Sequence, residues 1–289
     1  MERRDFFTAY SACIQGRDHA LQGKNCQDFS GVRSWEIGDR KCTFGVVLDG
    51  CGSGKHSEVG SSLLGTLLLN IIPEVINSRL IFMGVHNGVP EQEWVSQAVE
   101  NACLNLINLT LAQCLPVIRS EHERSWFVNE FFLTTIIYSL TVDAHVFVGS
   151  AGDGYLGVRQ SHNDKVVVHE LGDKDNTPSY LAYRTVDPLS LKGMGDKQFN
   201  LVNFYSLDPY LLFISTDGME RLVKEDRTQE LFNLGPKKLQ RWMNSGHALF
   251  KPKPDPEWGF DDDTAVVCLI WNRGAEDDEG GDKGQDSNA

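Results

Sequence analysis

The sequence lacks the features that define several classes of protein. Its seven cysteines are scattered and form no Cys-x-x-Cys pair, which disfavours a disulfide framework and a structural zinc knuckle and is typical of a reducing compartment. Lysine and arginine form no long cluster and the formal net charge is −13, so we expect no nucleic-acid partner. The first residues contain no signal-like apolar stretch, and the apolar run 131–150 is broken by Asp143 and His145. We therefore expect a soluble, cytoplasmic protein without a membrane partner.

Apolar sequence is present in the amount that a full core needs, since 41% of the 289 residues are hydrophobic. We expect one domain over residues 1–272. The acidic, glycine-rich tail at 273–289 is predicted to be disordered, because it can bury little apolar area. Segments 172–200 and 251–256, rich in glycine or proline, are predicted to be irregular surface.

The secondary-structure pattern favours an α+β fold. Two longer segments, 57–76 and 91–115, carry apolar residues at three- and four-residue spacing and predict amphipathic helices, the first kinked or ended near Pro73. Clustered strands with two consecutive helices between them fit an antiparallel β-sandwich flanked by helices on both faces (four layers, α-β-β-α) better than βαβ alternation. Runs rich in β-branched and aromatic residues predict strands at 42–48, 133–140, 145–148, 155–158, 166–169, 210–215 and 264–271.

Aspartate and glycine recur together where the apolar runs begin or end. A single Asp-Gly pair is a common turn, but repetition at the ends of predicted strands indicates a shared purpose. In each case a strand delivers a carboxylate to its end, and the glycine lets the backbone turn. The instances are Asp28, Asp49-Gly50, Asp153 between Gly152 and Gly154, Asp217-Gly218, and the run Asp261, Asp262 and Asp263.

Convergence of these carboxylates requires a cation. Two unit charges about 4 Å apart interact by about 4 kcal/mol at an effective dielectric constant near 20, and the motifs contain no arginine or lysine that offsets the repulsion. Hard divalent ions that prefer oxygen ligands, Mn²⁺ or Mg²⁺, fit this requirement, and the residues do not distinguish the two.

The order and form of these motifs resemble the metal-dependent protein phosphatases of type 2C, particularly the bacterial-type members. Residues 23–29 (GKNCQDF) are similar to the first motif of that family, and residues 49–54 (DGCGSG) to its second. Thr134-Thr135, Gly152-Asp153-Gly154, Thr216-Asp217-Gly218 and residues 261–264 (DDDT) follow in the family's order. The resemblance covers about residues 10–271.

The resemblance implies a two-metal site at one end of the sheets, with a third ion possible. Asp49 would bridge both metals, Gly50 would offer its backbone carbonyl to one, and Asp217 with Asp261 would bind the other. Counting back from Thr264 favours Asp261, although Asp262 remains a rival because the register of the aspartate run is uncertain by one. Asp153, with Asp217, would hold the additional ion, and Asp28 would orient a metal-bound water or bind directly.

The implied activity is hydrolysis of phosphoserine and phosphothreonine in proteins by a water that bridges two divalent ions, with Asp28, Asp49 and Asp217 as the catalytic carboxylates. The partners expected are a phosphoprotein and, in opposition, a serine/threonine kinase, and we expect a monomer. Three residues depart from the best-known pattern: Gly23 in place of an arginine that grips phosphate, Gln27 in place of a glutamate, and Cys51 in place of a histidine. Lys24 or Arg17 would then bind the substrate phosphate.

Two other functions remain open on these departures. One is a catalytically weak, phosphatase-like regulatory or binding module, and the other is a hydrolase of small phosphorylated metabolites. Residues 50–56 (GCGSGKH) superficially resemble a nucleotide-binding P-loop, but Asp49 and His56 stand where that pattern needs glycine and serine or threonine. Hydrolysis of nucleoside triphosphates is therefore not expected.

Overall fold

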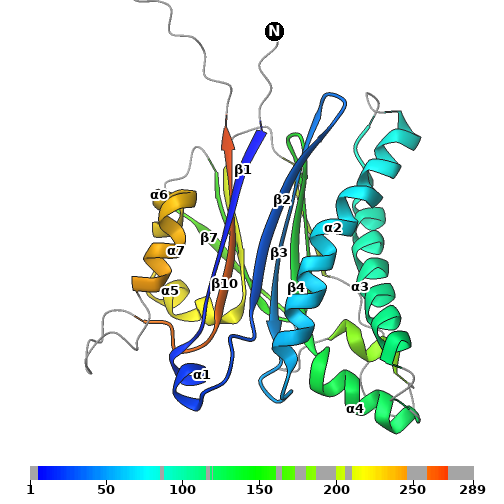
Figure 1. The fold of residues 1–289 in the computed structure, drawn as a ribbon. Helices are drawn as coiled ribbons and strands as arrows, with labels where there is room; N and C mark the ends of the chain where they lie inside the picture. Colours follow the sequence, from blue (N-terminus) through cyan, green and yellow to red (C-terminus); the bar gives the residue numbers. More distant parts are fainter. Residues whose placement is uncertain are drawn as a thin grey trace, which may run out of the picture.

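A computed structural model describes residues 6–84, 88–114, 118, 120–160, 165–172, 180–186, 200–205, 210–245 and 259–272 of the chain. Its strands form two antiparallel five-stranded sheets (Figure 1). The first sheet has the order β1 (Phe6–Ile14), β10 (Thr264–Asn272), β9 (Tyr210–Ser215), β6 (Gly154–Gln160) and β7 (Val167–Leu171). The second sheet has the order β2 (Phe29–Ile37), β3 (Arg40–Gly50), β4 (Thr134–Val142), β5 (His145–Ala151) and β8 (Asn200–Tyr205).

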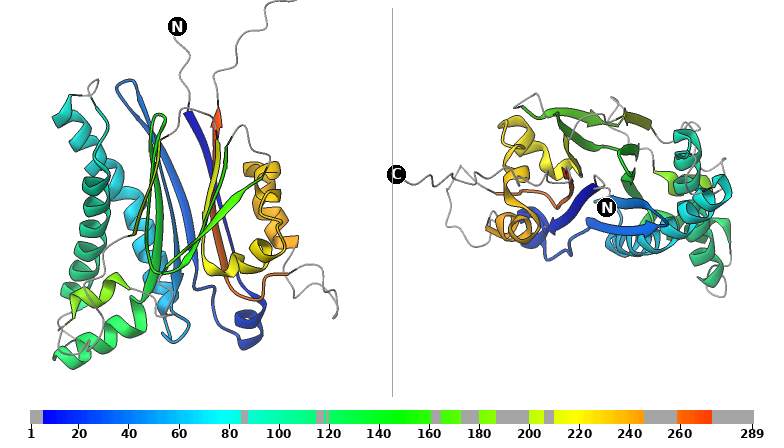
Figure 2. Two further views of the ribbon diagram at one scale, coloured as in Figure 1. Left: turned by 180° about the vertical axis from the view of Figure 1, so that it is seen from behind. Right: turned by 90° about the horizontal axis from the view of Figure 1, so that it is seen from above.

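Helices cover the outer faces of both sheets, so the predicted four-layer α-β-β-α sandwich is confirmed (Figure 2). The second sheet carries α2 (Ser57–Met83) and α3 (Gln92–Cys114), with α4 (Glu121–Phe131) near one end. The first sheet carries α5 (Glu220–Lys224), α6 (Glu230–Leu234) and α7 (Pro236–Ser245). Helix α1 (Arg17–Gln22) and the 3-10 turns η1 (Leu181–Thr185) and η3 (Asp217–Met219) lie at the end of the sandwich where β3 ends.

Strand β3 shows how one apolar run serves two packing layers. Successive side chains of a strand point to opposite faces, so Val46 and Leu48 pack against the α2 and α3 layer, whereas Val47 packs between the sheets. All three are fully buried. A continuous apolar run is therefore what this central strand requires.

The seven strands that the sequence predicts are all present, and the described residues contain three others that are not among those seven: β1, β2 and β8. Each of the three is an edge strand. Strand β2 shows the reason, because its burial is mostly partial and only Gly31 is fully buried. An edge strand that is half exposed has a weaker apolar pattern than a central strand, which makes it harder to detect from sequence.

Helix α2 corrects the expectation of a stop or a kink at Pro73, since the helix continues to Met83 with Pro73 buried inside it. Proline has no N–H and leaves the carbonyl four residues earlier, that of Leu69, without its helical partner. The guanidinium of Arg33 on β2 donates to this carbonyl (3.2 Å) and to the side chain of Asn70 (2.9 Å). A donor from the neighbouring strand thus replaces the missing hydrogen bond.

By length and composition alone, α2 could also cross a membrane. In this fold its residues Leu64, Leu68, Ile72 and Ile76 are buried against β3 and α3. Its apolar composition is therefore accounted for by its place in the core.

Part of the segment predicted to be irregular surface is neither irregular nor exposed. Turn η1 lies within residues 172–200, and Leu181, Ala182 and Thr185 are buried there. The neighbouring contacts are specific, because Arg184 pairs with the buried Glu100 of α3, and Arg124 of α4 donates to the Thr185 carbonyl (2.9 Å). Residues 251–256 and the tail 273–289 lie outside the described residues.

Candidate metal centre

The carboxylates predicted from sequence come from strand ends of both sheets. Phe29 pairs with Leu48 in the β2–β3 register, which places Asp28 beside the Asp49 end of β3. In the first sheet, Val266 pairs with Ser215, so the start of β10 lies beside the end of β9. Both sets of strand ends lie at the α1 end of the sandwich, shown at the bottom of Figure 1. Antiparallel pairing thus brings segments far apart in the chain to one end.

Asp28 is buried and joins the two sheets. Its Oδ2 accepts a hydrogen bond from the hydroxyl of Thr216 (2.7 Å), which follows β9. Its Oδ1 is buried and accepts no hydrogen bond from the residues that the structure describes. Burial raises the pKa of the Asp28 carboxyl well above its usual value, while the Thr216 hydrogen bond opposes this rise. A buried, unpaired carboxylate oxygen is the kind of group that a cation satisfies.

Three other carboxylates act electrostatically on Asp49. Burial is the largest cause of its strongly raised pKa, followed by the charges of Asp28 and Asp217 and, more weakly, of Asp262. The Asp49 backbone is held by β4, because the hydroxyl of Thr134 donates to its carbonyl (2.8 Å). Four carboxyl groups from four separate segments therefore act on one another at this point.

Asp217 is the first residue of η3, which follows β9. Burial, then the charges of Asp153 and Asp262, raise its pKa to about 6. Asp153 lies in the turn that carries the chain from β5 in one sheet to β6 in the other, and its own pKa is raised mainly by burial. The flanking Gly152 and Gly154 have φ values of 100° and 146°, a region that side chains disfavour. The two glycines permit the tight crossing that brings Asp153 toward Asp217.

The three consecutive aspartates before β10 have different surroundings. The side chain of Asp261 is 60% exposed and its Oδ1 lies 3.5 Å from the Arg17 guanidinium. Asp263 is 2% exposed and accepts hydrogen bonds from the backbone N–H groups of Gly16 (2.7 Å) and Gln27 (2.5 Å) and from His19 Nδ1 (2.8 Å). Asp263 therefore holds the α1 region to β10, a structural role that sequence reasoning missed.

Asp262 is the member of this run that acts electrostatically on both Asp49 and Asp217. It also has a carboxylate oxygen within 4.8 Å of ligand atoms of Asp263 and His19. The choice between Asp261, favoured by the count back from Thr264, and its rival Asp262 stays a prediction. The three residues of the run are all aspartates, so their type gives no sign of which one has the structural role. The only hint in the sequence is that Asp263 lies next to β10.

Gly50 occupies a position where a side chain does not fit. A Cβ there would lie 2.9 Å from the Gln27 carbonyl oxygen and 2.9 Å from Ser57 Oγ. The Gly50 N–H donates to the same Gln27 carbonyl (3.2 Å), so β3 is tied to the segment that carries Asp28.

Cys51 is half-buried, and its Sγ lies 3.1 Å from Ser53 Oγ. Burial acts to raise the pKa of the Cys51 thiol, but hydrogen bonds from Ser53 and Tyr180 outweigh this effect and lower the pKa.

The two cations considered for phosphate binding lie on and after α1. Arg17 has its guanidinium 3.7 Å from Asp18 and 3.5 Å from Asp261, and its Nε is buried without a hydrogen-bond partner among the described residues. Lys24 is exposed in the loop that leads to Asp28. Of the two side chains, Arg17 is therefore engaged by Asp18 and Asp261, and Lys24 is not.

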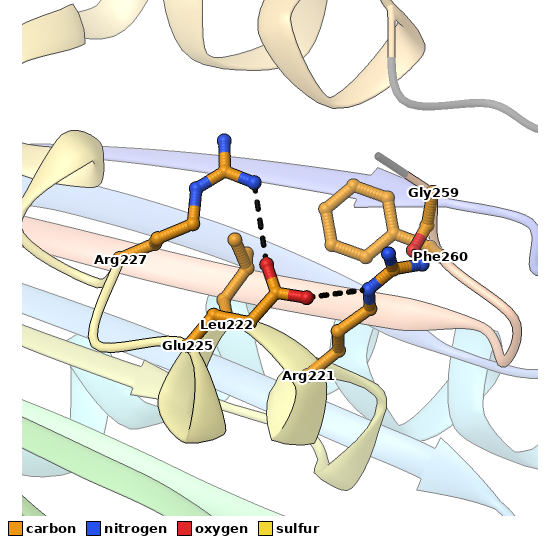
Figure 3. Close-up of a pocket in the computed structure, with 6 residues that line it drawn as sticks. All are labelled: Arg221, Leu222, Glu225, Arg227, Gly259 and Phe260. Atoms are coloured by element: carbon orange, nitrogen blue, oxygen red, sulfur yellow. Dashed lines mark hydrogen bonds and ion pairs between the residues drawn. The ribbon is translucent and has the colours of Figure 1, made fainter. Parts of the chain in front are cut away.

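A shallow pocket lies apart from these carboxylates, among residues of α5 and the segment before β10 (Figure 3). Glu225 stands between two arginines there, 2.9 Å from Arg221 Nε and 3.3 Å from Arg227 Nη1. Because the charges already pair with one another, we assign this pocket no ligand. Its lining consists of Arg221, Leu222, Glu225, Arg227, Gly259 and Phe260.

The donor set fits a divalent ion with oxygen ligands. The groups that act on one another are carboxylates, and one oxygen of Asp28 is buried without a hydrogen-bond partner among the described residues. Carboxylate and carbonyl oxygens suit Mg²⁺ and Mn²⁺, whereas zinc and copper sites favour histidine and cysteine. A cluster of this charge without a cation is destabilising.

Comparisons with known proteins agree with this geometry. A family model described as protein phosphatase 2C matches residues 15–245. Among solved structures, PppA, a regulatory component of the type VI secretion system in Pseudomonas aeruginosa, is 12% identical, with 92% of this chain and 98% of that chain covered and a TM-score of 0.53. A bacterial serine phosphatase that carries an arginine-to-alanine mutation is 14% identical, with 92% and 99% covered and a TM-score of 0.52.

The SpoIIE phosphatase structure from Bacillus subtilis, which includes a fragment of its regulatory domain, is 13% identical with a TM-score of 0.48. The alignment covers 94% of this chain but 65% of that one, so this chain spans about two thirds of its length. No curated protein sequence matches the chain. At these identities, the solved structures with a TM-score above 0.5 establish the shared fold, and the family model establishes the relationship.

Proposed function

The chain belongs to the protein phosphatase 2C family and is a metal-dependent serine/threonine protein phosphatase, and we propose that its convergent aspartates hold the metal ions. The observation that supports this proposal is the electrostatic environment of Asp49, on whose carboxyl group the charges of Asp28, Asp217 and Asp262 act. Since the four come from both sheets, chance clustering of turn residues does not account for them.

Asp49 would be the carboxylate that holds both ions, and the backbone carbonyl of Gly50 would supply one further ligand. Asp217 and Asp262 would hold the second ion, and Asp262 replaces Asp261 in this role because its charge acts on both Asp49 and Asp217. The ion pair between Asp261 and Arg17 explains why Asp261 would be the poorer ligand. Asp153 would join Asp217 at a third ion.

Divalent ions, when bound, supply an activated water as nucleophile and positive charge that stabilises the transferring phosphoryl oxygens. The protein's own part in the reaction is to orient the reacting groups. The Thr216 hydroxyl fixes Oδ2 of Asp28, whereas Oδ1 is buried and has no hydrogen-bond partner among the described residues. Asp28 would accept a proton from the attacking water at Oδ1, a role that its raised pKa in the metal-free protein suits. Lys24 would bind the substrate phosphate from the exposed side.

The test is hydrolysis of an aryl phosphate and of a phosphothreonine peptide, with Mn²⁺, with Mg²⁺ and with EDTA. We expect activity that depends on the metal, and a loss of at least about 100-fold in kcat/KM for Asp49→Asn, because removal of an outer-shell partner alone costs about 10- to 100-fold. Asp226→Asn is the matched control, since Asp226 is exposed and asparagine tolerates its φ of 52°. Turnover in EDTA, or full activity of Asp49→Asn, contradicts the proposal.

A catalytically weak binding module is the second candidate, favoured by Gln27. Its backbone N–H donates to Asp263 and its side chain to the Gly54 carbonyl (3.3 Å), so it serves the scaffold where the family often has a metal-binding glutamate. Calorimetry separates the candidates, because tight metal binding without turnover of any phosphopeptide favours the module. Sugar phosphates as substrates test the small-metabolite alternative.

We further propose a phosphoprotein substrate modified by a serine/threonine kinase, a monomeric state and a cytoplasmic location. The family supports the substrate class. Gel filtration with light scattering tests the monomer, and cell fractionation tests the location. The domain limit at residue 272 is tested by truncation, for which we expect unchanged activity.

A further inference from the structure

Two cysteines far apart in the sequence lie in contact beside the candidate metal centre. Cys13 is the penultimate residue of β1, and Cys26 is in the loop between α1 and β2. Their sulfur atoms are 3.6 Å apart, and both are free and partly exposed. This is close to van der Waals contact, and a disulfide has an S–S length of about 2.05 Å, so a closure of about 1.5 Å would join them.

Both thiols also contact the backbone of Asp28. Cys13 Sγ lies 3.5 Å and Cys26 Sγ 3.8 Å from the Asp28 carbonyl oxygen, each as a donor. Formation of a disulfide removes both S–H groups and therefore both of these hydrogen bonds. The chemical state of the two sulfurs is thus coupled to the residue that faces Asp49.

The contacts around the two cysteines limit where a cross-link can be accommodated. Cys13 is fixed on β1 through both backbone groups, since its N–H donates to the Gln240 side chain (3.2 Å) and its carbonyl accepts from it (2.8 Å). Gln27 is fixed on its other side by Asp263 (2.5 Å) and by Ser61 Oγ, which donates to its carbonyl (2.6 Å). Movement of Cys26 toward Cys13 must therefore be accommodated before Gln27, and it reaches Asp28 through the two S–H hydrogen bonds to its carbonyl that the cross-link removes.

We propose that Cys13 and Cys26 form a peroxide-sensitive dithiol, whose oxidation to a disulfide displaces Asp28 and weakens metal binding. The consequence for activity rests on the function proposed above, whereas the oxidation itself does not.

The chemistry balances with hydrogen peroxide as the oxidant. The sulfur of one thiol attacks a peroxide oxygen, an S–O bond forms as the O–O bond breaks, and one water leaves, giving a sulfenic acid. The sulfur of the second thiol then attacks the first, an S–S bond forms as the S–O bond breaks, and a second water leaves. Two thiols lose two electrons and two protons, and one peroxide becomes two waters.

The experiment treats the full chain with hydrogen peroxide and then removes the oxidant. Peptide mapping without reduction measures the Cys13–Cys26 cross-link by its loss of two hydrogens, and calorimetry measures Mn²⁺ affinity before and after treatment. We expect the cross-link, about a tenfold weaker affinity for Mn²⁺, and recovery of both after dithiothreitol. Activity toward an aryl phosphate should fall and recover in parallel at subsaturating Mn²⁺.

Two variants separate this dithiol from other cysteine damage, each compared with its own untreated sample. Cys26→Ser cannot form the cross-link, so peroxide should leave its Mn²⁺ affinity unchanged. Cys114→Ser removes another partly exposed cysteine, at the end of α3, and should respond to peroxide as the native chain does.

Persistence of both thiols as thiols after peroxide treatment overturns the inference. So does a cross-linked chain that binds Mn²⁺ as tightly as the reduced chain. Failure of the proposed function is distinct, because it would appear as absence of phosphopeptide hydrolysis in the reduced, Mn²⁺-loaded chain, whatever the cross-link and affinity measurements show.

Discussion

Replacement of Asp217 by asparagine should stabilise the metal-free protein while it weakens metal binding. The fold raises the pKa of Asp217 from 3.8 to about 6 in the absence of metal. A pKa difference of about two corresponds to about 3 kcal/mol, which is an upper value because the side chain keeps some contact with water. Asp217→Asn removes the charge and keeps the size, and its amide oxygen can still accept the hydrogen bond from the Gly218 N–H. We therefore expect the free energy of unfolding in EDTA at pH 8 to rise by about 1–3 kcal/mol.

The effect of Asp217 on stability depends on pH. A carboxyl whose folded pKa lies above its unfolded value binds more protons when folded, so this group destabilises the fold above about pH 6 and has no such effect below about pH 4. The advantage of Asp217→Asn should therefore shrink as the pH falls from 8 to 5. Saturating Mn²⁺ should reverse the order of stability, because the ion stabilises the native chain more than the variant.

Urea unfolding followed by tryptophan fluorescence measures these differences, with Asp226→Asn as the control for loss of one exposed negative charge. A variant that is less stable than the native chain in EDTA at pH 8 would refute the reasoning, since it would mean that the carboxylates do not strain the metal-free fold. An equal gain at pH 5 and pH 8 would also refute it, because the effect would not follow ionisation.

Three further substitutions test contacts of the fold and the site. Arg33→Ala should lower the free energy of unfolding by about 1 kcal/mol, because it leaves the half-buried Leu69 carbonyl without its donor. Pro73→Ala in the same chain should recover part of this loss in urea unfolding by restoring a backbone N–H. Thr216→Val should weaken Mn²⁺ binding about tenfold in calorimetry, because Asp28 Oδ2 loses its donor. Thr216→Ser keeps a hydroxyl donor and should bind Mn²⁺ as the native chain does. Lys24→Ala should raise KM for a phosphopeptide with little change in kcat, and an unchanged KM would remove this lysine from phosphate binding.

The central strands were predictable from the sequence because burial on both faces leaves a simple signal. Strand β4 is buried at every one of its nine positions, and its run of β-branched and apolar residues indicates a strand without further context. Strand β2 gives the opposite case, with polar residues such as Arg33 and Glu36 among its partly or fully exposed positions. Its pairing with β3 is a tertiary fact that a local pattern does not contain.

The location of the site could be predicted to a strand end, but not to a single residue. Asp49 and Asp217 each follow a recognisable buried strand, and both lie in the cluster. The run before β10 has three identical side chains, and their roles differ only because of what surrounds them: Arg17 for Asp261, the facing carboxylates for Asp262, and backbone N–H groups for Asp263. No property of the sequence alone distinguishes these surroundings.

Helix α2 shows a similar limit. Proline inside a helix predicts a break because the local hydrogen bond is lost, and that reasoning is sound for an isolated helix. Here the carbonyl of Leu69 finds a donor in Arg33, a residue 36 positions earlier on another element. A compensation of this kind depends on the packing of β2 against α2, so it becomes visible only in the folded chain.

The distribution of the carboxylates gives the metal ions a structural consequence as well as a chemical one. Asp28 and Asp49 belong to the second sheet, Asp217 and Asp262 to the first, and Asp153 to the crossing between them. Ions bound among these residues therefore link the two sheets at the end where their carboxylates repel one another. Metal removal should raise hydrogen exchange at the ends of β3 and β9 more than at the other end of the sandwich, because that repulsion acts within this end. Uniform exchange changes along both sheets would place the ions elsewhere.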